Sequence, residues 1–432
     1  MTLAVAIVAA VVSPLPFLPG THAAKVKASQ WSVMQVLKRE WGAFSGSETW
    51  SSSADCANMV GVACTSHGDI IAMDLSFKGL KGSIPASIGT LPEIQFLILA
   101  RNRLTGPLPP NFVNPAVLNQ LDLGDNQLSG SIPANFSRLG GLMELRLNNN
   151  QLSGTITEDV MPAWSNLRVL LLNNNQFSGS LPANMSRLQL LTELDVSSNQ
   201  LSENLLPDIN TLTALAYLSV SNNLMRLSIP SLSTLTNLYY LDLSKNQFSS
   251  LFPLGLDKLK KLQYLYLNDN AIFGSASPLM TSMSNLLELS IANTRVSGDV
   301  NTFLATFTTL TVLDIRESSL SGALSAGISD LTRLKELRMG GVIFDDVLPQ
   351  EIASLSGLSL LDLSNTKTHG PLPDPLDTMI SLRHLNLSGN VIGGFIDPIS
   401  TLTTLTYLGL SDVTFFTTPS NDFSRLRNLE AL

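Results

Sequence analysis

One pattern of apolar and polar positions, L-x-x-L-x-L-x-x-N-x-L-x-G-x-I-P, recurs along most of the chain. Successive repeats begin 23 to 25 residues apart, and their first apolar residues are Ile70, Ile94, Leu118, Leu142, Leu167, Leu191, Leu215, Leu238, Leu262, Leu286, Leu310, Leu334, Leu358, Leu382, Leu405 and Leu429. A unit of this length cannot bury its apolar residues alone, so each must stack on its neighbours. The pattern predicts one continuous solenoid over residues 70–432, with about fifteen complete repeats and a truncated sixteenth.

Each repeat predicts a short strand of a parallel sheet at its L-x-x-L-x-L segment, where the leucines point inward. The second, third, fifth, seventh and eighth positions then face the concave side of the stack, where a ligand could be recognised. The asparagine at the ninth position is expected to bond backbone groups of the neighbouring coil, because buried turn backbone must be paired.

The asparagine column is interrupted in the second half of the chain. It is regular from Asn102 to Asn270, changes to Thr294, Ser318, Val342 and Thr366, and returns at Asn390. Hydroxyl groups can replace part of the hydrogen bonding of asparagine, whereas valine cannot. Two interpretations stay open: sequence drift in a tolerant column, or a softened region that adapts to a partner.

The first residues have the layout of a secretory signal peptide, predicted over residues 1–24. A ten-residue apolar run from Leu3 to Val12 is followed by prolines and then by small residues before Ala24. No positive charge precedes the run, so a disordered leader is the alternative. A signal peptide predicts a secreted or cell-surface protein.

Residues 25–69 are predicted to form an N-terminal cap with one disulfide. Cys56 and Cys64 are the two cysteines of the chain, an even count that favours a bridge in a secreted protein. The histidines do not complete a metal-ligand set with them. Upstream, one helical face is expected to carry Trp31, Met34, Val36, Leu37, Trp41 and Phe44. Helix and bridge together would cover the open apolar end of the stack.

The cap and the repeats together resemble a known family. The segment "DCANMVGVAC" before "IIAMDLSFKGLKGSIPASIGTL", and phrases such as "LDLGDNQLSGSIPANFSRL", are similar to plant-type extracellular leucine-rich repeat proteins. These include receptor-like kinases, receptor-like proteins and polygalacturonase inhibitors, and the resemblance covers residues from about 30 to 432. Such caps usually carry a tryptophan between the cysteines, where this chain has Met59 or Val60.

The resemblance implies a fold and a function. The fold is an α/β leucine-rich repeat solenoid, a curved right-handed superhelix with a parallel β-sheet on the concave face and a helical N-terminal cap. The function is extracellular recognition of a peptide, protein or glycan ligand, in cell-surface signalling or defence, with a co-receptor as a further partner.

Composition excludes several other classes. Hydrophobic residues make up 44% of the chain, but they are spaced, so no internal run reaches the length of a membrane span. A net charge of -8 without a basic cluster argues against a nucleic-acid partner.

No catalytic or cofactor-binding motif stands out, so the chain is expected to be a binding protein without a cofactor rather than an enzyme. The aspartates at the fifth position are interpreted as a solvated column of the repeat phrase rather than as acid–base pairs: Asp74, Asp122, Asp195, Asp242, Asp314 and Asp362.

The tyrosines mark the candidate ligand-binding site, because all six occupy concave positions. Tyr217, Tyr240 and Tyr264 share the third position in successive repeats and are expected to stack at the strand spacing of about 4.8 Å. The predicted patch consists of Tyr217, Tyr239, Tyr240, Asp242, Tyr264, Tyr266, Glu193 and Glu288. The alternative is an aromatic ladder that only stiffens the sheet.

Three sequons predict glycosylation at Asn135, Asn184 and Asn386, the last at a concave position. The final repeat lacks a capping cysteine, which favours the ectodomain of a receptor-like kinase or receptor-like protein. The alternative is a free secreted inhibitor of a cell-wall hydrolase, or a wall-associated structural protein.

Overall fold

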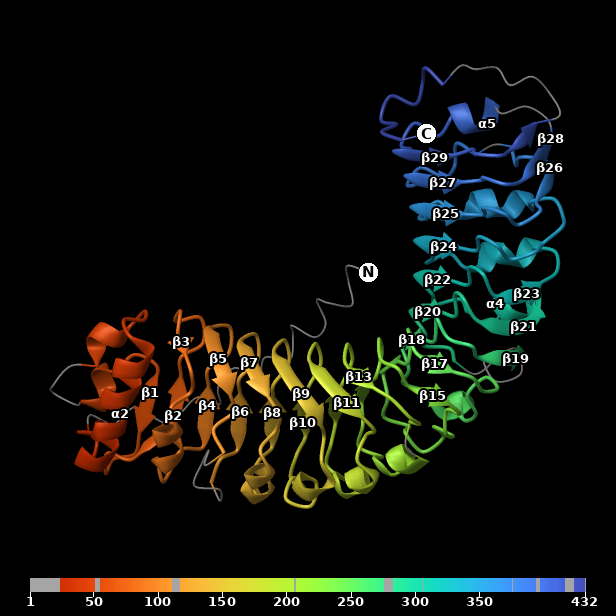
Figure 1. Ribbon diagram of the computed structural model, residues 1–432. Coiled ribbons are helices and arrows are strands. Elements are labelled where there is room, and N and C mark those ends of the chain that lie inside the picture. Colours follow the sequence, from red (N-terminus) through yellow and green to blue (C-terminus); the bar gives the residue numbers. More distant parts are fainter. Residues whose placement is uncertain are drawn as a thin grey trace. The chain divides into compact units, whose positions relative to one another are not determined.

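The computed structural model describes residues 24–50, 55–110, 117–205, 207–275, 283–305, 307–374, 376–393, 397–415 and 423–431. The expected signal peptide therefore lies outside the described residues, apart from Ala24. The chain divides into two compact units, the first ending at Gln176 and the second beginning at Phe177. Figure 1 labels their strands and helices in sequence order.

The first unit begins with helix α2 (Ala28–Trp41), whose buried stripe is Gln30, Val33, Met34, Leu37 and Trp41. The predicted face is right for Met34, Leu37 and Trp41, but Trp31 and Val36 are half-exposed and Phe44 lies beyond the helix. The stripe follows the spacing i, i+3, i+4 and i+7 from Gln30, and Trp31 lies one residue off this spacing.

Two polar contacts attach the helix to the first repeats. The indole nitrogen of Trp41 donates to the carbonyl of Ser83 (3.0 Å), and Gln30 Oε1 accepts from the amide of Ile70 (2.8 Å). Ile70 begins the first parallel strand, so the helix covers the start of the sheet.

The expected disulfide between Cys56 and Cys64 is present. It joins the 3-10 helix η3 (Cys56–Asn58) to β1 (Val62–Cys64), which pairs antiparallel with β2 (Ile70–Asp74). Met59, which stands where similar caps have tryptophan, is buried. The nearby Trp50 is buried as well, with its ring 5.0 Å from that of Phe44.

The remaining main strands of both units are parallel, and each pairs with the strand one repeat away. In the first unit they are β2, β4 (Phe96–Ile98), β6 (Gln120–Asp122), β8 (Glu144–Arg146) and β10 (Val169–Leu171). In the second unit they are β12 (Glu193–Asp195), β14 (Tyr217–Ser219), β16 (Tyr240–Asp242), β18 (Tyr264–Tyr266), β20 (Glu288–Ser290), β22 (Val312–Asp314), β24 (Glu336–Arg338), β25 (Leu360–Asp362), β27 (His384–Asn386) and β29 (Tyr407–Gly409).

Short side strands follow the main strands of most repeats. They are β3 (Lys81–Gly82), β5 (Arg103–Pro107), β7 (Gln127–Gly130) and β9 (Gln151–Thr155) in the first unit. β11 (Gln176–Gly179) begins at the last residue of that unit. In the second unit they are β13 (Gln200–Leu201), β15 (Arg226–Leu227), β17 (Gln247–Phe248), β19 (Phe273–Ser275), β21 (Arg295–Asp299), β23 (Ser319–Ser321), β26 (His369–Pro371), β28 (Val391–Gly393) and β30 (Thr414–Phe415).

Short helices return the chain to the next main strand. Most are 3-10 turns: η2 (Ser47–Thr49), η4 (Ala86–Thr90), η5 (Ala134–Arg138), η6 (Glu158–Val160), η7 (Ala183–Arg187), η8 (Pro207–Thr211), η9 (Leu256–Lys258), η10 (Ala326–Asp330) and η11 (Gln350–Ser354). Two are α-helical: α4 (Val300–Leu304) and α5 (Asp397–Ser400).

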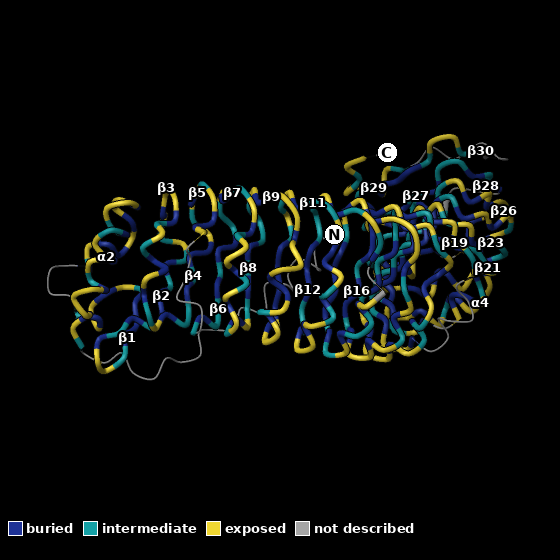
Figure 2. The backbone as a smooth tube through the Cα atoms, turned by 60° about the horizontal axis from the view of Figure 1, so that its bottom comes forward, coloured by how far each residue is buried: buried dark blue, intermediate teal, exposed yellow. Residues whose placement is uncertain are grey.

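The core consists of the repeat leucines, as the sequence pattern predicts. Leu241, Leu243 and Leu265 are each 0% exposed, and burial of one such side chain contributes roughly 1.5–3 kcal/mol. In Figure 2 buried segments recur along the repeats, and exposed residues lie at the turns. The period-two alternation of the strands leaves the positions between the leucines on the opposite face of the sheet, here called the sheet face.

The asparagine column pairs backbone groups, which confirms the expected structural role. Asn246 Nδ2 donates to the carbonyls of Val220 (3.0 Å), Leu243 (3.3 Å) and Ser244 (3.1 Å). Its Oδ1 accepts from the amide of Met225 (3.0 Å). One buried side chain thus links two successive coils.

The hydroxyl replacements in this column differ from one another. Thr294 donates to the carbonyl of Ile291 and Thr366 to that of Leu363 (2.9 Å). Ser318 does not substitute for asparagine, because its Oγ is buried without a hydrogen-bond partner in the described structure.

We expect Ser318→Asn to stabilise the second unit by about 1 kcal/mol, the net value of a regained hydrogen-bond set. By the pattern of Asn246, the new amide would donate to backbone carbonyls of its own coil and of the preceding one. Thermal unfolding measures the change. The control is Ser319→Asn, whose side chain is exposed. A Ser318→Asn protein no more stable than the wild type would show that the coil has no room for the amide.

Candidate ligand-binding surface

Five tyrosines meet on the sheet face of the second unit, and together they are called the tyrosine cluster: Tyr217, Tyr239, Tyr240, Tyr264 and Tyr266. Parallel pairing aligns Tyr217 of β14 with Tyr240 of β16, and Tyr240 with Tyr264 of β18. The same register places Glu193 of β12 beside Tyr217 and Glu288 of β20 beside Tyr264. The predicted column is therefore present in the predicted order.

The rings form a cluster rather than a regular stack. The rings of Tyr217 and Tyr240 stack as expected, with centroids 4.3 Å apart and planes at 9°. Tyr264 is 5.9 Å from Tyr240 and tilted by 38°, so the expected stacking is wrong for this pair. The ring of Tyr266 approaches Tyr240 to 5.7 Å from the neighbouring strand. Tyr264 and Tyr266 thus share the space beside the ring of Tyr240, which prevents Tyr264 from stacking parallel to it.

Burial separates the cluster into a floor and a rim. The side chains of Tyr217 and Tyr240 are 5% and 7% exposed, so they form the floor. Tyr239, Tyr264 and Tyr266 are half-exposed and form the rim. Tyr240 was predicted to form part of the ligand-binding patch. The rings of neighbouring strands cover Tyr240 instead, because the strand spacing is only about 4.8 Å.

Two carboxyl groups lie beside the floor, and sequence reasoning placed only one of them in the site. Asp242 Oδ1 accepts from the amide and the hydroxyl of Ser244 (2.9 and 2.6 Å). Asp195 Oδ1 accepts from the amide of Ser197 (2.9 Å), and its residue is 4% exposed. Burial raises the pKa of Asp242 and raises that of Asp195 to about 6. The interpretation of Asp195 as solvated is therefore wrong.

The other aspartates of the fifth position share this capping bond. Each accepts the amide of the residue two positions later, as in Asp74 to Ser76 (3.0 Å), Asp122 to Gly124 (3.0 Å) and Asp362 to Ser364 (3.1 Å). The column is thus half-buried and structural rather than freely solvated. Tyr217, in the repeat that follows Asp195, lies near its carboxyl group.

The rim carries further carboxylates. The hydroxyl of Tyr266 donates to Glu288 Oε2. Burial, followed by the nearby Glu288 carboxylate, raises the pKa of Tyr264, and burial followed by Glu193 raises that of Tyr239. The phenols therefore stay neutral, and the rim offers aromatic faces, hydroxyl groups and negative charge.

Three other carboxylates on the sheet faces are paired with arginine. Ion pairs join Glu144 to Arg146 (3.1 Å), Asp314 to Arg316 (2.7 Å) and Glu336 to Arg338 (2.7 Å). None of the ion pairs found among the described residues includes Asp195, Asp242 or Glu288. Among the described residues, arginine therefore forms no ion pair with these three carboxyl groups of the tyrosine cluster.

Tyr407 does not belong to the cluster. It lies in the same column of the sheet, on β29, where its ring stacks on His384 at 4.1 Å and 3°. Burial lowers the pKa of His384. This aromatic pair lies near Arg338 as well as Asp362 and outside the cluster, so it serves as an internal control.

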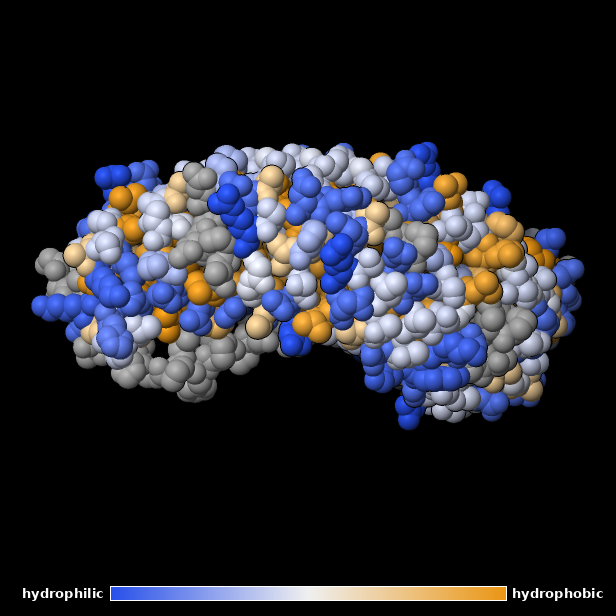
Figure 3. All heavy atoms as spheres, turned by 90° about the horizontal axis from the view of Figure 1, so that it is seen from below, coloured by the Kyte–Doolittle hydropathy of each residue, from blue (hydrophilic) through white to orange (hydrophobic). Residues whose placement is uncertain are grey.

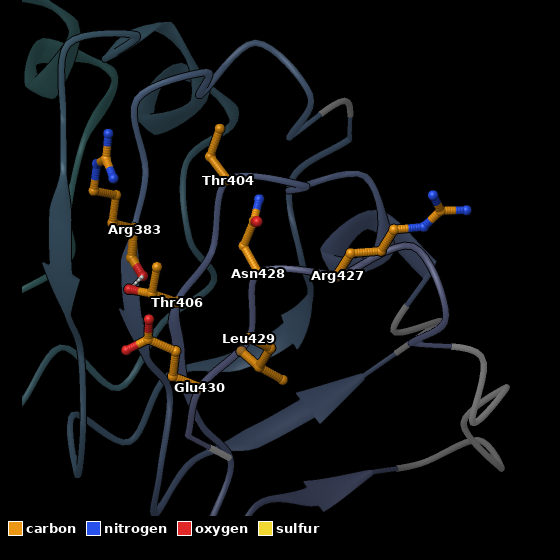
Figure 4. A pocket seen from close by; sticks show the side chains of 7 residues that line it. All are labelled: Arg383, Thr404, Thr406, Arg427, Asn428, Leu429 and Glu430. Atoms are coloured by element: carbon orange, nitrogen blue, oxygen red, sulfur yellow. Dashed lines mark hydrogen bonds between the residues drawn. The ribbon is translucent and has the colours of Figure 1, made fainter.

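A cavity of about 490 Å³ lies near the last described repeat, between Arg383 and Arg427. Figure 4 shows the two guanidinium groups pointing apart, while the Glu430 carboxylate lies near Thr406. The hydroxyl of Thr406 donates to the carbonyl of Arg383 (3.1 Å). Because no charge converges in this cavity, the tyrosine cluster is the stronger candidate.

Outside the tyrosine cluster, the exposed hydrophobic side chains of the described residues include Phe77 and Phe273, which lie in different repeats. In the view of Figure 3, hydrophobic residues form small groups among hydrophilic ones. The exposed Phe77, 66% accessible, lies under the guanidinium of Arg101 at 4.8 Å. No helix in the described ranges is long and apolar enough to cross a membrane. Nor do the described residues contain a group of three or more side chains that could hold a metal ion.

The three sequons differ in accessibility. Asn135 is exposed, and its amide donates to the carbonyl of Pro110 (3.0 Å). Asn184 and Asn386 are half-buried. Asn386 takes the place of the capping aspartate, since its Oδ1 accepts from the amide of Ser388 (3.1 Å). Glycosylation at these residues stays a prediction.

The fold and the repeats define the class of protein. The family model described as Leucine Rich Repeat matches residues 117–139, 166–188, 190–212, 237–259 and 381–402. The chain has a leucine-rich repeat solenoid fold, with the sheet and N-terminal helix that the sequence pattern predicted.

Its curated relatives are plant leucine-rich repeat receptor-like kinases and receptor-like proteins. A probable leucine-rich repeat receptor-like protein kinase of Arabidopsis thaliana is 36% identical over 75 residues, 17% of this chain and 8% of that kinase. Phytosulfokine receptor 1 of the same plant is 39% identical over 66 residues, 15% of this chain and 6% of the receptor. The matched segments thus span about a tenth or less of each relative's length.

Solved structures extend the likeness over most of the chain. The plant peptide hormone receptor RGFR1, in complex with RGF2, is 30% identical with a TM-score of 0.73 over 82% of this chain and 60% of that one. A TDR receptor is 27% identical with a TM-score of 0.75 over 85% of this chain and 68% of that one. These structures share the repeat architecture of both units' sheets.

Proposed function

We propose that this chain is the extracellular ligand-recognition part of a plant receptor-like kinase or receptor-like protein, and that the rim of the tyrosine cluster binds a peptide. The tyrosine cluster carries the proposal. Five of the chain's six tyrosines gather there, although exposed aromatic side chains are costly and typical of binding hot spots.

The shape of the surface favours an extended peptide over a compact small molecule. The rim tyrosines come from β18 and from the residue before β16, and Glu288 lies on the next strand, β20, so these side chains extend across neighbouring strands. Two cavities among the described residues, one near Arg427 and one near Leu376, lie elsewhere. Half-exposed rings with hydroxyl tips provide both apolar contact and hydrogen bonds to a peptide backbone.

The relatives support a receptor role. One similar structure is a plant peptide hormone receptor in complex with its peptide, and curated relatives include receptor kinases. A receptor ectodomain acts at the cell surface, which agrees with the signal peptide that the sequence predicts. Such a domain binds and does not catalyse, and its membrane anchor and signalling domain would lie in other segments of the protein.

A displayed library of random linear peptides, selected on the purified chain, tests the proposal. We expect enriched peptides whose affinity falls about 30-fold in Tyr264→Ala, which corresponds to a hot spot of about 2 kcal/mol. The matched control is Tyr407→Ala, which removes a ring from the same column outside the cluster and should bind as the wild type does. No enriched peptide, or equal losses in both variants, would reject peptide binding at the cluster.

A further inference from the structure

We propose that the tyrosine cluster recognises a cationic side chain, arginine or lysine, of the bound peptide. This inference rests on the proposed function and assigns the chemistry of the contact. The occupant is a positively charged group that contacts the rim tyrosines and the carboxylates of Asp242 and Glu288.

Charge complementarity is the first argument. Arginines compensate the sheet-face carboxylates Glu144, Asp314 and Glu336, whereas no arginine or lysine forms an ion pair with Asp242 or Glu288 among the described residues. Lys245 lowers the pKa of Asp242, but its effect is the smallest of those that act on this carboxyl group. A ligand cation would supply the charge that arginine supplies in those three repeats.

The aromatic geometry is the second and independent argument. A cation is attracted to the face of a tyrosine ring within about 6 Å of its centroid. Tyr264 and Tyr266 are half-exposed on β18, the strand beside the buried Tyr240, at 5.9 and 5.7 Å from its ring. They present their outer surfaces next to Glu288, which bonds the Tyr266 hydroxyl. A ring face beside a carboxylate suits a guanidinium or ammonium group better than a neutral or acidic one.

The floor of the cluster makes this arrangement rigid. Tyr217 and Tyr240 are stacked at 4.3 Å, and their hydroxyl groups are hydrogen-bonded to each other. Asp195 and Asp242 lie in the same row of the sheet on either side of Ser219. The rim side chains are therefore held on a packed base, so the ligand loses less free energy in ordering them.

Two synthetic peptides that differ only in charge test the inference. The first is an acetylated, amidated Gly-Arg-Gly-Arg-Gly peptide, and the second has citrulline, an uncharged analogue of the same shape, in place of both arginines. We expect the arginine peptide to bind the purified chain at least tenfold more tightly than the citrulline peptide, by calorimetry at low ionic strength. Equal affinities for the two peptides would overturn the inference.

Paired variants separate the site from the overall negative charge of the chain. Glu288→Gln and Glu336→Gln each remove one negative charge at the same strand position, but Glu336 is already paired with Arg338. We expect the arginine peptide to bind about tenfold more weakly to Glu288→Gln and nearly normally to Glu336→Gln. Equal losses in both variants would mean that the attraction is only long-range.

A charge reversal adds a readout that altered folding would not produce. Glu288→Lys should lose the arginine peptide and gain affinity for a Gly-Glu-Gly-Glu-Gly peptide. Failure of the swap, with normal unfolding of the variant, would contradict direct contact at Glu288. The displayed library distinguishes the two proposals: enriched peptides that depend on Tyr264 but lack basic residues would keep the proposed function and reject the cationic contact.

Discussion

We expect Tyr240→Ala to lower the stability of the second unit by about 3 kcal/mol, within the range for truncating a buried aromatic side chain. Tyr240 is 7% exposed, and its ring lies within 6 Å of the rings of Tyr217, Tyr264 and Tyr266. Removing it leaves a cavity that these side chains cannot fill without losing their positions. Hydrogen exchange of β14, β16 and β18, together with thermal unfolding, measures the loss.

The matched control for this substitution is Tyr407→Ala, since Tyr407 has a single ring neighbour, His384. A loss of about half the size is expected there. Peptide binding should also weaken in Tyr240→Ala, because the rim loses its support. A variant that unfolds normally but no longer binds would contradict the floor assignment and show that Tyr240 contacts the ligand directly.

We expect Asp195→Asn to stabilise the second unit at pH 8 by up to about 3 kcal/mol, since one pKa unit corresponds to about 1.4 kcal/mol. Burial raises the pKa of Asp195 from 3.8 to about 6. Between these values the folded protein binds more protons than the unfolded chain, so stability rises as the pH falls through 6. Above pH 6 the buried carboxylate is charged and destabilises the fold, and asparagine removes this cost.

Polar and charged groups surround the carboxyl group of Asp195. Its carboxyl group is bonded by Ser197 and acted on by Asp242 and Glu193, and it lies near Tyr217. Thermal unfolding from pH 4 to pH 8 should show the difference between wild type and variant vanishing near pH 4. The control is Asp362→Asn. The carboxyl group of Asp362 is half-exposed and accepts the same kind of hydrogen bond, from the amide two residues later. A constant difference across the pH range would contradict the assignment.

Local sequence reasoning predicted the elements of the molecule well. The repeat spacing predicted the parallel strands, the buried leucines and the bonding of Asn246 to two coils, because each depends on a fixed offset within a repeat. The pairing of Cys56 with Cys64 followed from their isolation next to the first repeat. In the helix, spacing misassigned Trp31 and Val36, since several apolar stripes are consistent with one short segment.

The residues of the candidate site could be predicted from the sequence, but the burial of each side chain could not. Parallel register follows from the constant repeat length, so the alignment of Tyr217, Tyr240 and Tyr264 could be read in advance. Which of these rings is covered depends on how side chains from adjacent strands tilt and share space. This packing buries Tyr240 and Asp195 and leaves Tyr264 half-exposed.

The sequence by itself determined the repeat architecture, the strand positions and the set of side chains on the sheet face, because a periodic chain brings equivalent positions together once the strands pair. Only the tertiary structure decided which tyrosines form the floor and which form the rim, that Ser318 has no partner, and that Asp195 is buried. These properties arise from contacts between residues one repeat apart, and their distances and angles are set by packing rather than by spacing along the chain.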